Sequence, residues 1–190
     1  PLHQEPERVL LLANPYYTNQ LETIRHIAKS IPIGYTLFVK EHPTMKIRGW
    51  HPINYYTEIQ KIPNVKLIHP SLSSEILMKE CSLVISVGGT ASFEAAFYQK
   101  PSIIFADVEY AVLSSVHKLN CIEELPSTIN NALQKTVTPD DLTKYVYFLE
   151  HNSFDFNLIE FYSEIADYFY FGSYLADVEI NLKNMREFIT

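Results

Sequence analysis

Short apolar runs alternate with amphipathic stretches over the first two thirds of the chain. Runs of this kind, rich in β-branched residues and bounded by Pro or Gly, are typical of strands buried on both faces. Between them, apolar residues recur at spacings of three or four, which indicates helices. The expected strands cover residues 8–13, 35–39, 65–68, 83–87, 102–105 and 119–122. The expected helices cover residues 21–28, 55–62, 73–80, 90–98 and 127–134.

Strands that alternate with helices along a chain form parallel sheets with helices on both faces. Right-handed crossovers then produce a doubly wound sheet. We therefore expect an α/β fold, with a Rossmann-like domain over residues 1–138.

The pattern changes from about Pro139, where the expected strands stop. Residues 140–151, 156–171 and 175–188 read as helices, and 12 of the 25 aromatic residues fall between Tyr145 and Tyr174. One helix buries only a stripe of its surface, so some of these rings must face another element. We expect residues 139–190 to be a helical extension that packs on the first domain and on a domain absent from this chain.

Composition excludes several classes of protein. Of the 190 residues, 47% are hydrophobic and 19% are charged, which is too apolar for a disordered chain. The net charge of −7 is opposite in sign to that of most nucleic-acid-binding proteins, so we expect no nucleic-acid partner. Two cysteines are too few for a disulfide scaffold, and no apolar run approaches the roughly 18 residues of a membrane span.

Two of the five glycines stand where an expected strand meets an expected helix, in the segment Gly88-Gly89-Thr90-Ala91-Ser92. Glycine lets a backbone approach a ligand closely, and the start of a helix offers unpaired N–H groups and partial positive charge. The segment is therefore a candidate phosphate site. Glu94, one turn later, either complements the helix dipole or accepts hydrogen bonds from a ribose. The competing interpretation is a strand-to-helix turn capped by Thr90 and nothing more.

A second candidate lies after the expected strand 35–39. Pro43 favours extended backbone at His42, which holds the imidazole at the rim of the sheet. Lys40, Lys46 and Arg48 surround it in an otherwise acidic chain, which suits an anionic ligand. A histidine before a proline is also common at strand ends that bind nothing.

Serines follow the next expected strand. Ser71, Ser73 and Ser74 can hydrogen-bond phosphate or sugar, or can cap the helix that follows. We include Lys40, Ser73 and Ser74 among the candidate substrate-binding residues. The remaining six histidines have no spacing typical of metal ligands.

Four segments occur in order along residues 8–115, namely Val39-Lys40-Glu41-His42-Pro43, Pro63–Pro70, Val87–Ala95 and Lys100–Phe105. Together they resemble the nucleotide-sugar-binding half of GT-B glycosyltransferases, and within these the bacterial capsule and surface polysaccharide biosynthesis family. That family carries a K-x-H-P element, a G-T-A/S-x-x-E-A helix start and a G-K-P-x-I-x-F strand. The chain departs from the pattern at Gln99, where the family usually has Gly.

The resemblance implies two Rossmann-like domains with the active site between them. This chain would be the C-terminal, donor-binding domain, and the acceptor domain would be missing from it. The resemblance also implies that His42 and residues 89–92 contact donor phosphate and that Glu94 contacts the ribose or sugar.

Glycosyl transfer needs stabilisation of the leaving nucleotide phosphate, which helix N-termini and basic side chains can supply without a metal ion. No D-x-D pair follows an expected strand, so we expect no metal ion and no other cofactor. On this hypothesis His42 is the catalytic residue.

The expected partners are a nucleotide sugar linked through CMP, UDP or GDP, a polysaccharide or glycolipid acceptor, and the N-terminal GT-B domain. The expected location is the bacterial cytoplasm or the inner face of the cytoplasmic membrane. Two other interpretations stay open: a sugar-nucleotide 2-epimerase, which shares this architecture, and a non-catalytic α/β scaffold that binds a partner through its aromatic helices.

Overall fold

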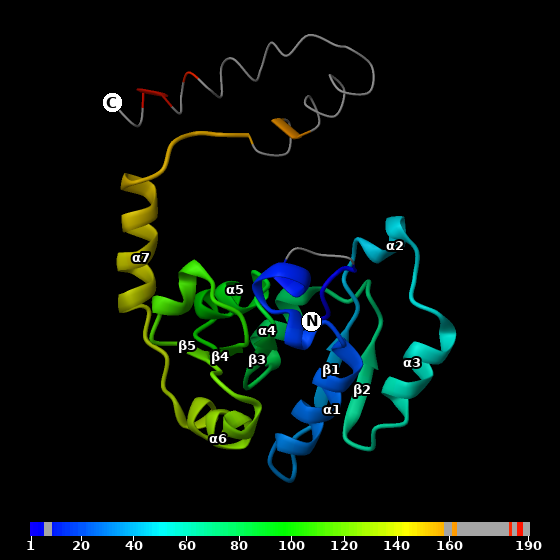
Figure 1. Ribbon diagram of the computed structural model, residues 1–190. Coiled ribbons are helices and arrows are strands. Elements are labelled where there is room, and N and C mark those ends of the chain that lie inside the picture. The colour runs from blue at the N-terminus through cyan, green and yellow to red at the C-terminus, as the bar shows by residue number, and fades with distance from the viewer. Residues whose placement is uncertain (6–8, 158–160, 163–182, 184–185, 188–190) are drawn as a thin grey trace, which may run out of the picture. The chain divides into compact units, whose positions relative to one another are not determined.

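The computed structural model describes residues 1–5, 9–157, 161–162, 183 and 186–187 (Figure 1). The chain divides into two compact units, Pro1–Leu142 and Thr143–Thr190. All strands of the described residues lie in the first unit. The helices expected over 156–171 and 175–188 lie mainly outside the described residues.

The first unit is an α/β structure with two parallel sheets (Figure 1). In one sheet, β1 (Leu37–Lys40) pairs with β2 (Val65–Ile68), and the last residues of the two strands lie opposite each other. The other sheet has the order β3-β4-β5, formed by Val84–Ser86, Ser102–Ile104 and Val116–Lys118. The strands expected near residues 37, 65, 84 and 102 are therefore confirmed.

Helices connect the strands, as the alternating pattern predicted. They are α1 (Gln20–Ser30), α2 (Met45–Arg48), α3 (Ile53–Gln60), α4 (Ser74–Glu80), α5 (Ala91–Phe97), α6 (Leu125–Gln134) and α7 (Asp140–His151). Short 3-10 turns cover Pro15–Tyr17, Glu109–Val112 and Ile122–Glu124. Each expected helix up to residue 151 is confirmed, and α2 is an additional one. None of the helices described is both long and apolar enough to cross a membrane.

The strand expected over residues 8–13 is wrong. Val9–Ala13 forms a turn of π-helix, closed by a 3.0 Å hydrogen bond from the Asn14 N–H to the Val9 carbonyl. A short apolar run fits a buried helix turn as well as a strand, and leucine favours helix. Leu10 enters the core, whereas Leu11 and Leu12 are 53% and 75% exposed. As a result the structure has two parallel sheets in place of the single sheet expected.

The strand expected over residues 119–122 is also displaced. The strand is Val116–Lys118, and Ile122–Glu124 forms a 3-10 turn. Only the first residue of Val-His-Lys is apolar, so the hydrophobic pattern hides this strand. Leu119 directly follows it and is 3% exposed, because it enters the core from the end of β5.

One helix contacts the cores of both sheets. Ile27 of α1 lies in the cluster that includes Ile103 of β4 and Ile129 of α6. Ile24, one turn earlier, belongs to the cluster with Val39 of β1. The spacing of three places the two isoleucines on one apolar face. Helix α1 therefore packs against both sheets and holds them in one unit.

Candidate functional site

The N-terminal segment joins the carboxyl ends of β1 and β3. The Leu2 N–H donates to the carbonyl of Lys40, the last residue of β1, at 2.8 Å. The next side chain, His3, accepts a hydrogen bond from the Gly88 N–H through Nε2 at 3.4 Å. Gly88 follows β3 by two residues. The carboxyl ends of the two sheets therefore lie close together, and they form one edge along which a ligand can bind.

Close packing explains the glycines at residues 88 and 89. A Cβ on Gly88 would lie 3.0 Å from the side chains of Ala106 and Val9, and one on Gly89 would lie 3.2 Å from the His3 ring. The Tyr110 hydroxyl donates to the Gly89 carbonyl at 2.7 Å. The resemblance implied that His42 and this turn contact the same donor phosphate, and the structure places a different histidine, His3, against the turn.

The side chains of the first turn of α5 bind one another and the adjacent strands. Thr90 precedes the helix without a capping side-chain bond, and its hydroxyl donates to the Glu94 carboxylate at 2.8 Å. Ser92 is buried and lies 2.8 Å from the Ser86 hydroxyl of β3. Its carbonyl accepts a hydrogen bond from Ser102 of β4 at 3.0 Å. Ser92 therefore fastens α5 to the sheet.

The structure brings several predicted residues together at the ends of β1 and β2. Lys40 is buried, and its ammonium donates to the Ser74 hydroxyl at 2.9 Å in a partly buried contact, which joins the end of β1 to the start of α4. Nδ1 of His42 lies 2.7 Å from the Thr44 hydroxyl. Ser73 precedes α4 at the N-cap position and makes no capping side-chain bond.

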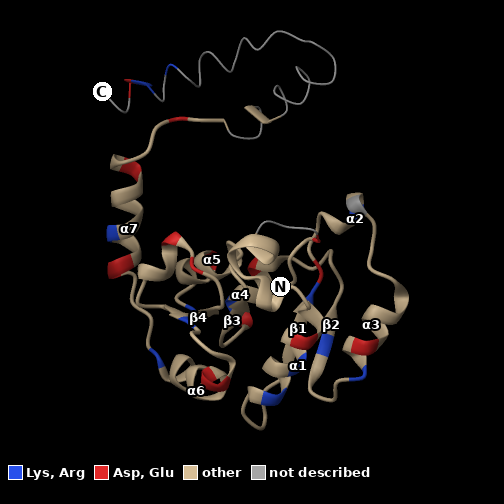
Figure 2. Cartoon of the chain, in the orientation of Figure 1, with Lys and Arg blue, Asp and Glu red and all other residues tan. Residues whose placement is uncertain are grey.

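A buried carboxylate lies directly beside His42. Glu41 is 2% exposed and accepts hydrogen bonds at 2.8 Å from the His42 N–H and the Tyr56 hydroxyl. Its Oε2 is also 2.8 Å from Nδ1 of His51, whose ring stacks on Tyr55. Burial, and next the hydrogen bond to Glu41, raise the pKa of Tyr56 to about 12. Charges of both signs lie at this end of β1, where the ribbon is blue and then red (Figure 2).

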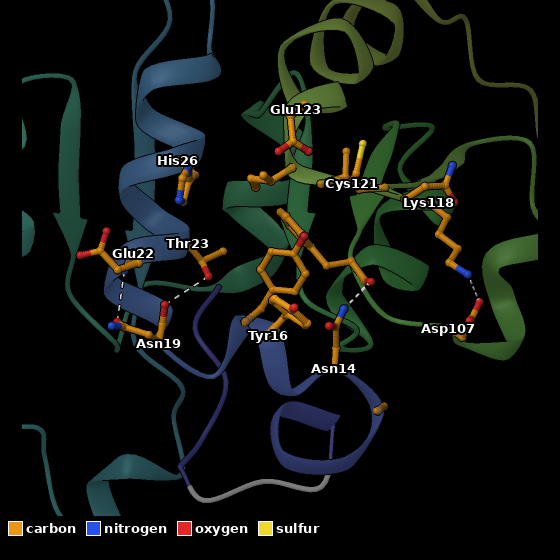
Figure 3. A pocket seen from close by; sticks show the side chains of 16 residues that line it. Asn14, Tyr16, Asn19, Glu22, Thr23, His26, Asp107, Lys118, Cys121 and Glu123 are labelled. Atoms are coloured by element: carbon orange, nitrogen blue, oxygen red, sulfur yellow. Dashed lines mark hydrogen bonds and ion pairs between the residues drawn. The ribbon is translucent and has the colours of Figure 1, made fainter.

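A cavity of about 630 Å³ opens at the carboxyl ends of β4 and β5 (Figure 3). Its walls come from the segment before α1, the first two turns of α1, and the loops after the two strands. Asn14 fixes one wall, because its side-chain amide donates to the Phe105 carbonyl at 2.5 Å. Tyr16 projects among the lining side chains and is 95% exposed. The other lining residues with polar side chains are Tyr17, Asn19, Glu22, Thr23, His26, Asp107, Lys118, Asn120, Cys121 and Glu123.

Carboxylates outnumber cations in this cavity. Glu22, Asp107 and Glu123 line it, and the Lys118 ammonium forms an ion pair with Asp107. Burial, and next the Cys121 and Glu123 side chains, raise the pKa of Tyr17. A phosphate would meet repulsion here, whereas the hydroxyl and amide groups of a nucleoside would find hydrogen-bond partners.

None of the binding residues singled out in the sequence lines this cavity. The sequence did place residues 106–110 after a strand, which is the relevant position, whereas residues 14–19 follow the expected strand that is a π-helix turn in the structure. It gave no reason to prefer them, because asparagines and tyrosines lack the distinctive chemistry of a His-Pro or Gly-Gly pair. His3 was missed as well, because its role depends on contacts 85 residues away.

No group of three His, Cys, Asp or Glu side chains among the described residues is arranged to hold a metal ion. Comparisons with protein-family models, with curated proteins and with solved structures found no match.

Proposed function

We propose that this chain binds a nucleotide sugar along the carboxyl ends of its strands and is the donor-binding part of a GT-B-type glycosyltransferase. The observation that carries the proposal is the cavity at the ends of β4 and β5. Open α/β structures bind ligands beyond the carboxyl ends of their strands. A volume of about 630 Å³ lies within the roughly 300–1,000 Å³ range of small-molecule sites.

The distribution of charged side chains favours binding of the nucleoside and the phosphates of the donor at different places along this edge. The cavity is rich in carboxylates and amides, so it would take the uncharged nucleoside. The buried Lys40 and the His42 imidazole lie at the end of β1 and suit the phosphates. The edge is continuous between the two parts, because the Ala106 N–H bonds the Val87 carbonyl, the Gly88 N–H bonds His3, and the Leu2 N–H bonds the Lys40 carbonyl.

The chemical role of His42 follows from its place at this edge. When the bond between sugar and phosphate breaks, negative charge develops on the leaving phosphate, and a positioned donor stabilises it. Glu41 holds the His42 backbone through the 2.8 Å bond to its N–H, and Thr44 holds the ring. Both contacts fix the imidazole before the donor arrives. The acceptor would be a surface polysaccharide or glycolipid, bound by a second domain in the bacterial cytoplasm or at the inner face of its membrane.

Calorimetric titration of the chain with CMP, CDP, UDP and GDP tests the proposal. Tyr16→Ala is the informative variant, because the ring lines the cavity and its exposure means that truncation costs little stability. Loss of its stacking on the base should weaken binding about tenfold. Tyr147→Ala is the matched control, since this tyrosine is 61% exposed on α7, outside the lining of the cavity.

Binding of at least one nucleotide, weakened by Tyr16→Ala and unchanged by Tyr147→Ala, is the expected result. Failure of all four nucleotides to bind would overturn the proposal. Equal effects of the two variants would overturn the assignment of the cavity. Conversion of a nucleotide sugar without any acceptor would replace the transferase by an epimerase.

A further inference from the structure

The segment that connects β1 to α3 exposes three large apolar side chains. Ile47 of α2 is 89% exposed, Trp50 is 51% exposed and Ile53 of α3 is 84% exposed. Single exposed apolar residues are normal on a protein surface, whereas three within seven residues indicate a contact surface. We call residues 46–53 the tryptophan loop, because Trp50 is the one tryptophan of the chain.

The fold fixes both ends of the tryptophan loop and leaves the apolar side chains between them outside. Met45, just before the loop, is buried. Near its other end, Nδ1 of His51 lies 2.8 Å from the buried Glu41 carboxylate, and the ring stacks on Tyr55 with centroids 4.3 Å apart. Between these two anchors, Gly49 has a φ of +103°, a conformation that favours glycine and turns the chain. The exposure is therefore a product of packed neighbours.

The loop also differs in charge from the rest of the chain. From residue 42 to residue 57 the sequence contains Lys46 and Arg48 and no Asp or Glu, although the whole chain has a net charge of −7. Lys46 is exposed and has no carboxylate within ion-pair distance among the described residues. The two flanking carboxylates have other partners, since Glu41 belongs to the buried network and Glu58 pairs with two cations of its own. The loop is thus a small cationic and apolar patch on an acidic protein.

The position of the loop separates it from the cavity described above. Helix α2 lies beyond the ends of β1 and β2, at the periphery of the first unit (Figure 1). The loop contributes no side chain to the lining of the cavity at the ends of β4 and β5. Its apolar side chains therefore need a different partner.

This chemistry matches the surface of an anionic bilayer. Tryptophan is enriched at the level of lipid headgroups, and aliphatic side chains flanked by Lys and Arg bind where headgroups meet acyl chains. Basic residues without nearby carboxylates are attracted to anionic lipids. A stable protein interface needs about 20–30 residues on each side, which is far more than one short loop supplies.

We propose that the tryptophan loop docks on a membrane surface that contains anionic lipids. Ile47, Trp50 and Ile53 enter the headgroup region, and Lys46 is attracted to the lipid phosphates. The contact is peripheral, since only one loop takes part. It goes beyond the proposed function and does not depend on it, because lipid binding by this loop requires no nucleotide.

The fluorescence of Trp50 reports this contact directly, because no other tryptophan contributes to the signal. The chain is mixed with vesicles of phosphatidylglycerol and phosphatidylcholine in equal amounts, and cosedimentation measures the bound fraction. The emission of Trp50 should shift to shorter wavelength, and lipids with brominated acyl chains should quench it. Vesicles of phosphatidylcholine alone should bind more weakly, and added salt should weaken binding to the anionic vesicles.

Two pairs of variants test the apolar and the charged part of the loop. Ile47→Ser should weaken vesicle binding about tenfold through the loss of buried apolar area, whereas Ile33→Ser, at a fully exposed position before β1, should have no effect. Lys46→Glu should weaken binding to anionic vesicles about thirtyfold, since it replaces an attractive charge by a repulsive one. Lys66→Glu is its control, because Lys66 is exposed on β2 outside the loop. Circular dichroism of each variant confirms that the fold is kept.

The outcomes decide the proposal independently of nucleotide binding. A wavelength shift on anionic vesicles that both loop variants weaken and both controls preserve supports it. No shift and no cosedimentation would overturn it, as would equal effects of the loop variants and their controls. A shift that appears without lipid as the chain is concentrated would assign the loop to contact between two copies and overturn the membrane contact. Nucleotide titrations are done without lipid, so failure of the membrane contact leaves the proposed function standing, and the reverse holds as well.

Discussion

Replacement of Glu41 by alanine should strongly destabilise the fold, because its carboxylate is the shared acceptor of a buried network. The side chain is 2% exposed and receives hydrogen bonds from the His42 N–H and the Tyr56 hydroxyl, with Nδ1 of His51 at the same 2.8 Å. Removing it leaves these groups without an acceptor. Breaking a buried charged network in this way typically costs about 3–5 kcal/mol.

Urea unfolding followed by circular dichroism measures this loss. Glu41→Ala should shift the midpoint to lower urea without changing the slope, and thermal unfolding should show a fall of about 10 °C. Glu22→Ala is the control, because that side chain is 50% exposed in a surface ion pair with Arg25 and should cost less than about 1 kcal/mol. If Glu41→Ala costs no more than Glu22→Ala, the network does not hold this end of β1.

Three further predictions follow from packing and titration. Ile129→Ala should lower the free energy of unfolding by about 2–5 kcal/mol in urea, because Ile129 is 0% exposed. The control Ile33→Ala, at a fully exposed position, should change it by less than about 0.5 kcal/mol. Equal losses in the two variants would contradict the assigned core. Gly88→Ala should cost about 1–3 kcal/mol in the same assay, since its Cβ would lie 3.0 Å from Ala106, and an unchanged midpoint would contradict that packing. Because the pKa of Tyr56 is raised, the folded state gains stability that is complete below pH 10 and is lost as the pH rises to about 12. In an absorbance titration of tyrosinate, Tyr56→Phe should remove the ionisation step near pH 12. If the variant keeps this step, the step belongs to another tyrosine.

The sequence predicted those helices and strands in which the pattern of apolar residues matches the residues that are buried in the structure. Val65–Ile68 is a strand as expected, and α1 has the apolar spacing that its two-sided packing requires. The pattern failed at Val9–Ala13, where five apolar residues fit a helix turn equally well. It also failed at Val116–Lys118, where the strand is stabilised by its pairing with β4 and contains one apolar residue. Strand pairing decides Val116–Lys118 and core packing of Leu10 accompanies the helix turn at Val9–Ala13, and no local pattern reports either.

The candidate site was predictable in part for a similar reason. His42 and Lys40 became candidates because a proline and nearby cations mark them in the sequence. The hydrogen bond between Lys40 and Ser74 was not found, because it joins residues 34 positions apart, at the end of β1 and the start of α4. The cavity was missed because its walls come from segments far apart in the chain, such as Asn14 and Phe105, which are 91 residues apart.

Chemical-shift mapping on addition of a nucleoside diphosphate tests the central claim most directly. Backbone amide signals should move in residues 16–23 and 105–107, in 118–123, and at His42 and Thr44. Residues 58–64, at the other end of β2, should stay unchanged. Shifts confined to residues 58–64, or no shifts at saturating nucleotide, would contradict a donor site at the carboxyl ends of the strands.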